Sequence, residues 1–189
     1  MRAYYHTRFR NDLLNFMARQ DVLYFGHSWH VDCEGLDRIP IERRADFLVC
    51  LYFTVLTDQT VHAHFRHLYN QFEALTQYPK FSHGLGQFQK NPRQILDIPM
   101  ERGLISLEIL TAALPSGMEL FIDEVEDFSV HHMPEIKTKD FFDRLLHDAD
   151  VEVPLLAVMV DPKLKESPGF RVYECLRNAV ERRYGKEIK

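Results

Sequence analysis

The sequence predicts one domain of the α/β or α+β class, with a small mixed sheet of about four strands covered by about five helices. Segments rich in β-forming residues alternate along the chain with segments of about ten to twenty residues whose apolar side chains recur at helical spacing. The 189 residues, of which 46% are hydrophobic, suffice for one buried core, and no polar linker divides them. We therefore expect a single globular domain over residues 1–189.

The first third of the chain predicts one helix and two strands. Apolar residues recur at helical spacing over 8–19, and the β-forming residues of 22–31 predict a strand. The polar residues of 32–45 predict a loop. The apolar run 46–56 has the Val, Phe, Tyr and Thr content of a strand that is buried on both faces. A helix over 41–56 is the alternative, because good helix formers lie at its start.

The middle of the chain predicts two helices joined by a long loop. Thr57-Asp58 offers the side-chain oxygens of an N-cap, and an apolar stripe follows it as far as Tyr78. Residues 79–97 contain two Gly and two Pro, which predict a long loop of the kind that is often mobile or functional. A second helix is expected over 97–114, ended by the Pro-Ser-Gly that follows it.

The remaining strands are expected between residues 118 and 160. Residues 118–123 and 127–133 predict two short strands, and a helix over 118–127 is the alternative. The unbroken apolar run 153–160 predicts a central strand of the sheet, with a proline at its start, where proline is tolerated.

Two amphipathic helices are expected around that central strand. The first covers 138–148 and turns four apolar side chains inward, namely Phe141, Phe142, Leu145 and Leu146. The second runs from Phe170 to Tyr184, and Gly185 has the position of the glycine that often follows a helix C-terminus.

Cysteine usage and hydropathy restrict where the protein acts. Cys33, Cys50 and Cys175 show neither paired nor C-x-x-C spacing, which is typical of proteins in a reducing compartment. No apolar run reaches the roughly 20 residues that cross a bilayer, and the N-terminus does not resemble a signal peptide. We expect a soluble cytoplasmic protein that does not contact a membrane.

Charge is distributed unevenly along the chain, whose formal net charge is −5. Residues 119–152 carry eleven acidic and three basic residues, a net of −8, whereas residues 162–189 carry a net of +4. Such a layout can steer the approach of a partner. We therefore expect the acidic block 119–152 to contact a macromolecule, with a protein as the expected partner.

The loop 79–97 is a second candidate surface. It interleaves basic and aromatic side chains, a combination that can hold a nucleic-acid backbone and stack on its bases: Lys80, Phe81, Phe88, Lys90 and Arg93. A pI near 6.0 argues against strong sequence-independent affinity for nucleic acid. The aromatic content is also compatible with a homodimer face.

One spacing in the sequence suggests catalysis more than any other, that of Asp123, Glu135 and Lys137. A carboxylate at the end of one strand and an acidic-x-Lys pair on the next would let two carboxylates bind Mg²⁺ beside a lysine that stabilises developing charge. The order of the expected elements around them resembles the core of the PD-(D/E)xK nucleases, although no Pro precedes Asp123 and Pro134 interrupts the second strand. This resemblance implies a Mg²⁺-dependent nuclease in which Asp123 and Glu135 hold the metal.

Histidines give weaker signals. His62, His64 and His67 lack the i,i+4 spacing of a helical metal site, and His30 with Asp32 would share a face of the strand over 22–31. We therefore expect a non-enzymatic binding or regulatory protein without a cofactor, which acts through the acidic block or the loop 79–97. The Mg²⁺-dependent nuclease is the alternative.

Overall fold

The protein is described by a computed structural model that covers residues 40–64, 92–132 and 134–185. Within these residues every regular element is a helix, and none is a strand. The prediction of an α/β or α+β fold with a mixed sheet of about four strands is therefore wrong for this part of the chain. The helix over 8–19, the strand over 22–31 and the first part of the loop 79–97 lie outside the described residues.

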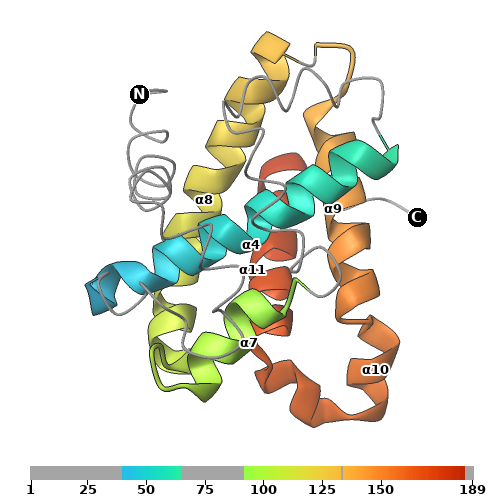
Figure 1. The fold of residues 1–189 in the computed structure, drawn as a ribbon. Coiled ribbons are helices and arrows are strands. Elements are labelled where there is room, and N and C mark those ends of the chain that lie inside the picture. The colour runs from blue at the N-terminus through green and yellow to red at the C-terminus, as the bar shows by residue number, and fades with distance from the viewer. Residues whose placement is uncertain (1–39, 65–91, 133, 186–189) are drawn as a thin grey trace.

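Three long helices lie side by side and a fourth crosses them (Figure 1). α11 runs between α8 and α9 and contacts both, and α4 packs across α8 and α9. Two short helical elements, α10 and η4, connect α9 to α11 at the end of the bundle. The bounds are α4 (Ile41–His64), α7 (Gln94–Glu101), α8 (Leu107–His132), α9 (Thr138–Glu152), α10 (Leu155–Val160), the 3₁₀ helix η4 (Pro162–Glu166) and α11 (Pro168–Tyr184).

The apolar run 46–56 is part of α4, so the alternative of a helix over 41–56 is confirmed and the buried strand is wrong. A strand would bury every second residue, or all of them, whereas the buried positions here follow the helical period. Among the α4 side chains that the structure describes, the buried ones are Ala45, Leu48, Val49, Tyr52, Phe53, Leu56 and Thr60. Because α4 continues to His64, Thr57-Asp58 lies inside a helix and is not an N-cap.

α8 continues through Pro115, where the sequence predicts that a helix ends. Proline removes one backbone hydrogen bond, but an apolar stripe at helical spacing continues on both sides of it and keeps the helix on the core. The buried members of this stripe are Leu110, Leu114, Met118, Ile122 and Val125. The strands over 118–123 and 127–133 are therefore wrong, and the alternative of a helix over 118–127 is confirmed.

The predicted helices in the last third of the chain are confirmed. α9 buries Phe141, Phe142 and Leu145, and Leu146 packs partly buried against the same core. α11 ends at Gly185, whose φ of 80° lies in the left-handed region that glycine adopts without strain.

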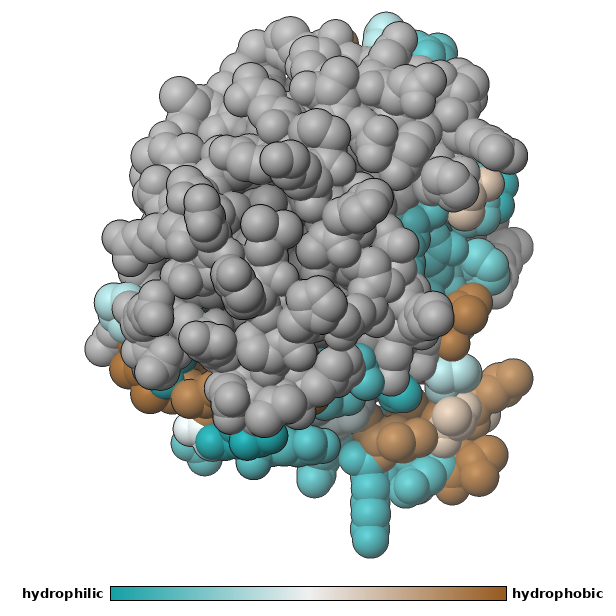
Figure 2. Space-filling model, in the orientation of Figure 1, coloured by the Kyte–Doolittle hydropathy of each residue, from teal (hydrophilic) through white to brown (hydrophobic). Residues whose placement is uncertain are grey.

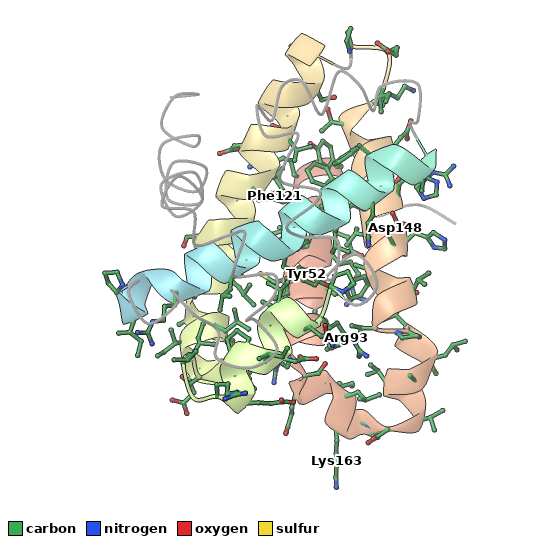
Figure 3. All side chains as sticks on the ribbon, in the orientation of Figure 1. Tyr52, Arg93, Phe121, Asp148 and Lys163 are labelled. Atoms are coloured by element: carbon green, nitrogen blue, oxygen red, sulfur yellow. The ribbon has the colours of Figure 1, made fainter. Side chains whose placement is uncertain are left out.

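An aromatic chain joins the four long helices in the core. Phe53 of α4 stacks on Phe121 of α8, with ring centroids 4.8 Å apart. Phe121 meets Phe142 of α9 edge-on at 6.2 Å, and Phe142 lies 6.0 Å from Tyr184 of α11. Figure 3 labels Phe121 on α8, near α4. Offset and edge-on ring pairs of this kind add about 0.5–1.5 kcal/mol each to the burial of the rings.

Two polar contacts hold the connections between helices. Arg44 Nη1 of α4 donates to the carbonyl oxygen of Leu104, in the turn between α7 and α8, at 2.8 Å. Ser129 is buried in α8, and its hydroxyl donates to the carbonyl oxygen of Ile136, just before α9, at 3.3 Å. No helix in the described residues is long and apolar enough to cross a membrane.

Candidate interaction surface

The apolar run 153–160 forms helix α10, so the predicted central strand is wrong. Pro154 precedes the helix, and Asp150 Oδ1 accepts a hydrogen bond from the backbone N–H of Leu155 at 2.8 Å. A carboxylate at this position satisfies a backbone donor that a short helix leaves without an internal partner. At the other end, Asp161 N–H donates to the carbonyl oxygen of Ala157 at 2.8 Å. The helix is therefore bracketed by an aspartate on each side.

α10 is attached to the core by one side only. Val153, just before it, and Val158, within it, are buried. Gly169 of α11 lies so close to this attachment that a Cβ atom there would come within 3.1 Å of Val153 Cγ2. This close approach explains the absence of a side chain at position 169, and it holds the segment that leads into α10 against α11.

The other side of α10 is apolar and exposed. At 100° per residue, Leu156, Met159 and Val160 fall within about 100° of the helix circumference, roughly opposite Val158. Val151, in the last turn of α9 and five residues before Leu156, is also exposed. The exposed fractions are 68% for Val151, 76% for Leu156, 79% for Met159 and 86% for Val160. We call these four residues the α10 surface.

The α10 surface forms a projecting corner of the molecule. Figure 2 shows hydrophobic atoms gathered at the lower right, where Figure 1 places α10, with hydrophilic side chains below and beside them. Single exposed apolar side chains are common in folded proteins, but a contiguous group marks an interaction site.

The acidic residues of α8 contact α11. Glu119, Asp123 and Glu126 lie at i, i+4 and i+7, on one side of α8. All three contact the guanidinium of Arg183: Nη2 to Glu119 Oε2 at 2.9 Å, and Nη1 to Asp123 Oδ1 at 2.6 Å and to Glu126 Oε2 at 3.1 Å. Arg182 Nη2 adds a contact to Glu119 Oε1 at 3.0 Å. These carboxylates therefore fix α8 against the C-terminal end of α11.

Two groups beside this cluster have raised pKa values. Tyr184 donates its hydroxyl proton to Glu126 Oε1, and burial, followed by this hydrogen bond to a carboxylate, raises the pKa of Tyr184 above its ordinary value. Burial also raises the pKa of the free thiol of Cys175, which keeps it in the less reactive protonated form. Neither group therefore carries the features of a nucleophile or of a base active at neutral pH.

Asp148 of α9 forms hydrogen bonds with two side chains near the C-terminal end of α4. Its Oδ2 accepts a hydrogen bond from the buried hydroxyl of Thr60, and its Oδ1 lies 3.1 Å from His64 Nε2 (Figure 3). Of the histidines predicted as candidate ligands, His64 is therefore paired with a carboxylate. In the described residues, no group of three or more His, Cys, Asp or Glu side chains is placed to hold a metal ion.

The structure does not bring Asp123, Glu135 and Lys137 together in the arrangement of a nuclease. Asp123 lies in the middle of α8 and is paired with Arg183, with about 13 Å of helix between it and the end of α8 at His132. Glu135 lies in the turn that follows, and Lys137 precedes the first residue of α9. The strands that were expected to carry these three residues are absent from the described segments, so the predicted setting of the Mg²⁺ site is wrong there.

Of the residues proposed in the loop 79–97, Arg93 is described, and Lys80, Phe81, Phe88 and Lys90 lie outside the described residues. Arg93 precedes α7, which begins at Gln94, inside the segment predicted as a loop. A Cβ atom on Gly169 would come within 3.3 Å of the Arg93 side chain, so its aliphatic part packs against α11. Burial raises the pKa of the nearby Asp97, an effect that the charge of Arg93 opposes.

No protein-family model matches this chain, and neither the curated proteins nor the solved structures contain a significant match. By its own geometry, the described part of the molecule is a helical bundle with an exposed apolar corner. The α10 surface was missed because an unbroken apolar run is also typical of a central strand. The signal that could have found it is the repeated placement of proline at helix starts, at Pro154, Pro162 and Pro168.

Proposed function

We propose that this chain is a binding protein that holds a protein partner on the α10 surface. The observation that carries the proposal is the exposure of Val151, Leu156, Met159 and Val160 on one corner of the molecule. Each of these side chains is left in water, although its burial would contribute about 1.5–3 kcal/mol. A partner with a matching apolar face would recover part of this free energy, and apolar anchors of this kind dominate the affinity of protein interfaces.

The charged candidates support binding less directly. In the acidic block 119–152, Glu119, Asp123 and Glu126 already contact arginines of α11, so a partner would have to compete with these contacts. Binding through the α10 surface requires no such rearrangement. Cytoplasmic action is part of the same proposal, because the cysteine spacing shows no disulfide framework and Cys175 is a free thiol.

The α10 surface can be tested with a matched pair of substitutions. Val160→Asp places a charge in the surface, and Val130→Asp places the same charge at the opposite end of the bundle, on α8 (Figure 1). Val130 is 67% exposed, so neither variant should alter folding, which circular dichroism and thermal unfolding would check. The measurement is a quantitative capture of binding partners from a cytoplasmic extract, followed by purification of the captured protein and titration against each variant.

We expect Val160→Asp to weaken binding of the purified partner at least tenfold and Val130→Asp to leave it unchanged. The physical reason is that a carboxylate at the centre of an apolar contact loses its hydration without gaining a counter-charge. Equal affinity of the two variants for every captured protein would contradict the proposed function.

A further inference from the structure

The elements around the α10 surface carry a net negative charge. Residues 138–166, which span α9, α10 and η4, contain seven acidic and four basic residues, a net of −3. The acidic residues are Asp140, Asp143, Asp148, Asp150, Glu152, Asp161 and Glu166, and the basic residues are Lys139, Arg144, Lys163 and Lys165. Any macromolecule that covers the α10 surface approaches through the field of these charges.

An aspartate lies at each end of α10. Before the helix, Asp150 Oδ1 accepts the backbone N–H of Leu155 at 2.8 Å, and after it Asp161 Oδ1 accepts the backbone N–H of Lys163 at 3.1 Å. A backbone N–H is a neutral donor, so it leaves the charge of the carboxylate in place, and an ionised carboxylate is the natural acceptor for it. α10 has six residues and is about 9 Å long. The exposed apolar side chains of α10 therefore lie between two negatively charged groups.

Neither aspartate is neutralised by a cation within the described part of the chain. Asp150 and Asp161 form no ion pair with another described residue. The carboxylates of α8 differ in this respect because they contact Arg183, as does Asp143, which pairs with Lys139 at 2.7 Å. The two aspartates next to α10 are therefore free to pair with a cation that a partner supplies.

The other basic residues of these elements lie outside the segment that the two aspartates bracket. Lys163 and Lys165 follow Asp161 and belong to η4. Figure 3 shows the Lys163 side chain extending away from the bundle. On the other side, Arg144 precedes Val151 by seven residues, about 10 Å along α9. The charged groups at the two ends of α10 itself are therefore carboxylates.

From this arrangement we propose that the partner is a protein segment that presents large apolar side chains with lysine or arginine on both sides of them. This proposal rests on the proposed function, since it concerns the same surface and adds the charge of its occupant. The apolar side chains would cover the α10 surface, and the flanking cations would approach Asp150 and Asp161. A second copy of the same face would instead bring these aspartates against each other. Complementary charge at the rim of an apolar contact selects the partner and raises the rate of association.

The experiment selects peptides from a phage-displayed library in which a short apolar block lies between random positions, with the full chain as bait. We expect Lys and Arg to be enriched at the random positions, and Asp and Glu to be depleted. The affinity of synthetic copies should fall as NaCl rises from 50 to 500 mM, because salt screens exposed charges. Enrichment of Asp and Glu, or an affinity that does not change with salt, would overturn the basic partner.

Two variants with opposite expected effects test the charges of the surface. D150N/D161N removes both charges but keeps an acceptor oxygen for each backbone N–H, and it should weaken binding of the selected peptides about fivefold. K163E/K165E makes the same corner more negative and should strengthen binding by about the same factor. Weaker binding to K163E/K165E, or unchanged binding to D150N/D161N, would overturn the basic partner.

E108Q/D140N is the matched control, because it also removes two carboxylates but in the first turns of α8 and α9. Asp140 lies ten residues before Asp150, about 15 Å away along α9, and Figure 1 shows the start of α8 away from α10. We expect this variant to bind the peptides as wild type does, and thermal unfolding would verify that each variant is folded. A loss equal to that of D150N/D161N would overturn the proposal, since the effect would then come from the net charge of the chain alone.

The outcomes separate this inference from the proposed function. Val160→Asn places an uncharged polar group in the α10 surface, so it weakens the apolar contact without altering the charge. Peptides that lose binding in V160N but bind D150N/D161N normally would overturn the basic partner and leave the apolar surface intact. Peptides that bind V160N as well as wild type, or a selection that enriches no peptide, would overturn both proposals.

Two further measurements test other occupants of the surface. Self-association in the analytical ultracentrifuge that V160N abolishes would identify a second copy of the chain. V160N-sensitive binding to vesicles of 70% phosphatidylcholine and 30% phosphatidylserine would identify a lipid surface. Either result would overturn the basic protein segment, and the absence of both would support it.

Discussion

The acidic side chains of α8 and the apolar side chains of α10 differ in whether they find partners within the molecule. On α8, three carboxylates lie within 3.1 Å of one guanidinium group, that of Arg183. On α10, Leu156, Met159 and Val160 are left largely exposed to solvent. The α8 carboxylates therefore have their counter-charge within the molecule, whereas the apolar side chains of α10 are not buried by it. An exposed group of large apolar residues is therefore the better indicator of where a partner binds.

The largest expected change in stability comes from a charge placed on the buried side of α10, compared with the same charge on its exposed side. Val158→Asp should lower the free energy of unfolding by about 3 kcal/mol or more, because it buries a carboxylate without a partner. Val160→Asp should change it by no more than about 0.5 kcal/mol, as expected for an exposed position. Val158 is 4% exposed and Val160 is 86% exposed, although only Met159 separates them in the chain. Urea denaturation of the two variants provides the measurement, and similar losses in both would contradict the orientation of α10.

The spacing of apolar residues predicted α9 and α11 correctly because in these two segments it fits a helix and not a strand. α9 and α11 alternate apolar and polar faces with the helical period over many residues, and a glycine follows α11. In the run 46–56 almost every residue is apolar or β-forming, so the same residues fit a strand and a helix. Positions outside the run decide between them, because Ala45 and Thr60 continue the buried helical face of α4.

Long-range packing explains the features that the pattern could not predict. Pro115 indicates a helix end from local chemistry, but the stripe from Leu110 to Val125 holds α8 on the core across it. Hydropathy likewise makes the residues of α10 look like core, although Val158 is buried while Leu156, Met159 and Val160 are exposed. The exposed surface was thus a consequence of tertiary contacts and could not be predicted from the run itself.

The contacts of Arg183 with the carboxylates of α8 should make the next largest contribution to stability. Arg183→Met should lower the free energy of unfolding by about 1–2 kcal/mol, since it removes hydrogen bonds to charged groups and leaves like charges together on α8. The difference from wild type should shrink as NaCl rises towards 1 M, because salt screens both effects. Arg182→Met is the control: that side chain is 63% exposed and contacts one carboxylate, so a loss of about 0.5 kcal/mol or less is expected. Equal losses in the two variants would show that the cluster does not hold α8 to α11.

The smallest expected effect comes from Tyr184, the neutral member of the same cluster. Tyr184→Phe should cost about 1 kcal/mol at neutral pH by removing the hydrogen bond to Glu126, with exposure to solvent limiting the loss. Because the pKa of Tyr184 is raised in the folded protein, its contribution is complete below pH 10, the ordinary tyrosine value, and is lost as the pH rises above it. The pKa of Tyr173 is also raised, but that residue is present in both proteins and cancels in their difference. The difference in unfolding free energy should therefore be constant from pH 7 to 9 and decrease between pH 10 and 11, as measured by urea denaturation. A difference that stayed constant across pH 10 would place the tyrosine outside the charged contact between α8 and α11.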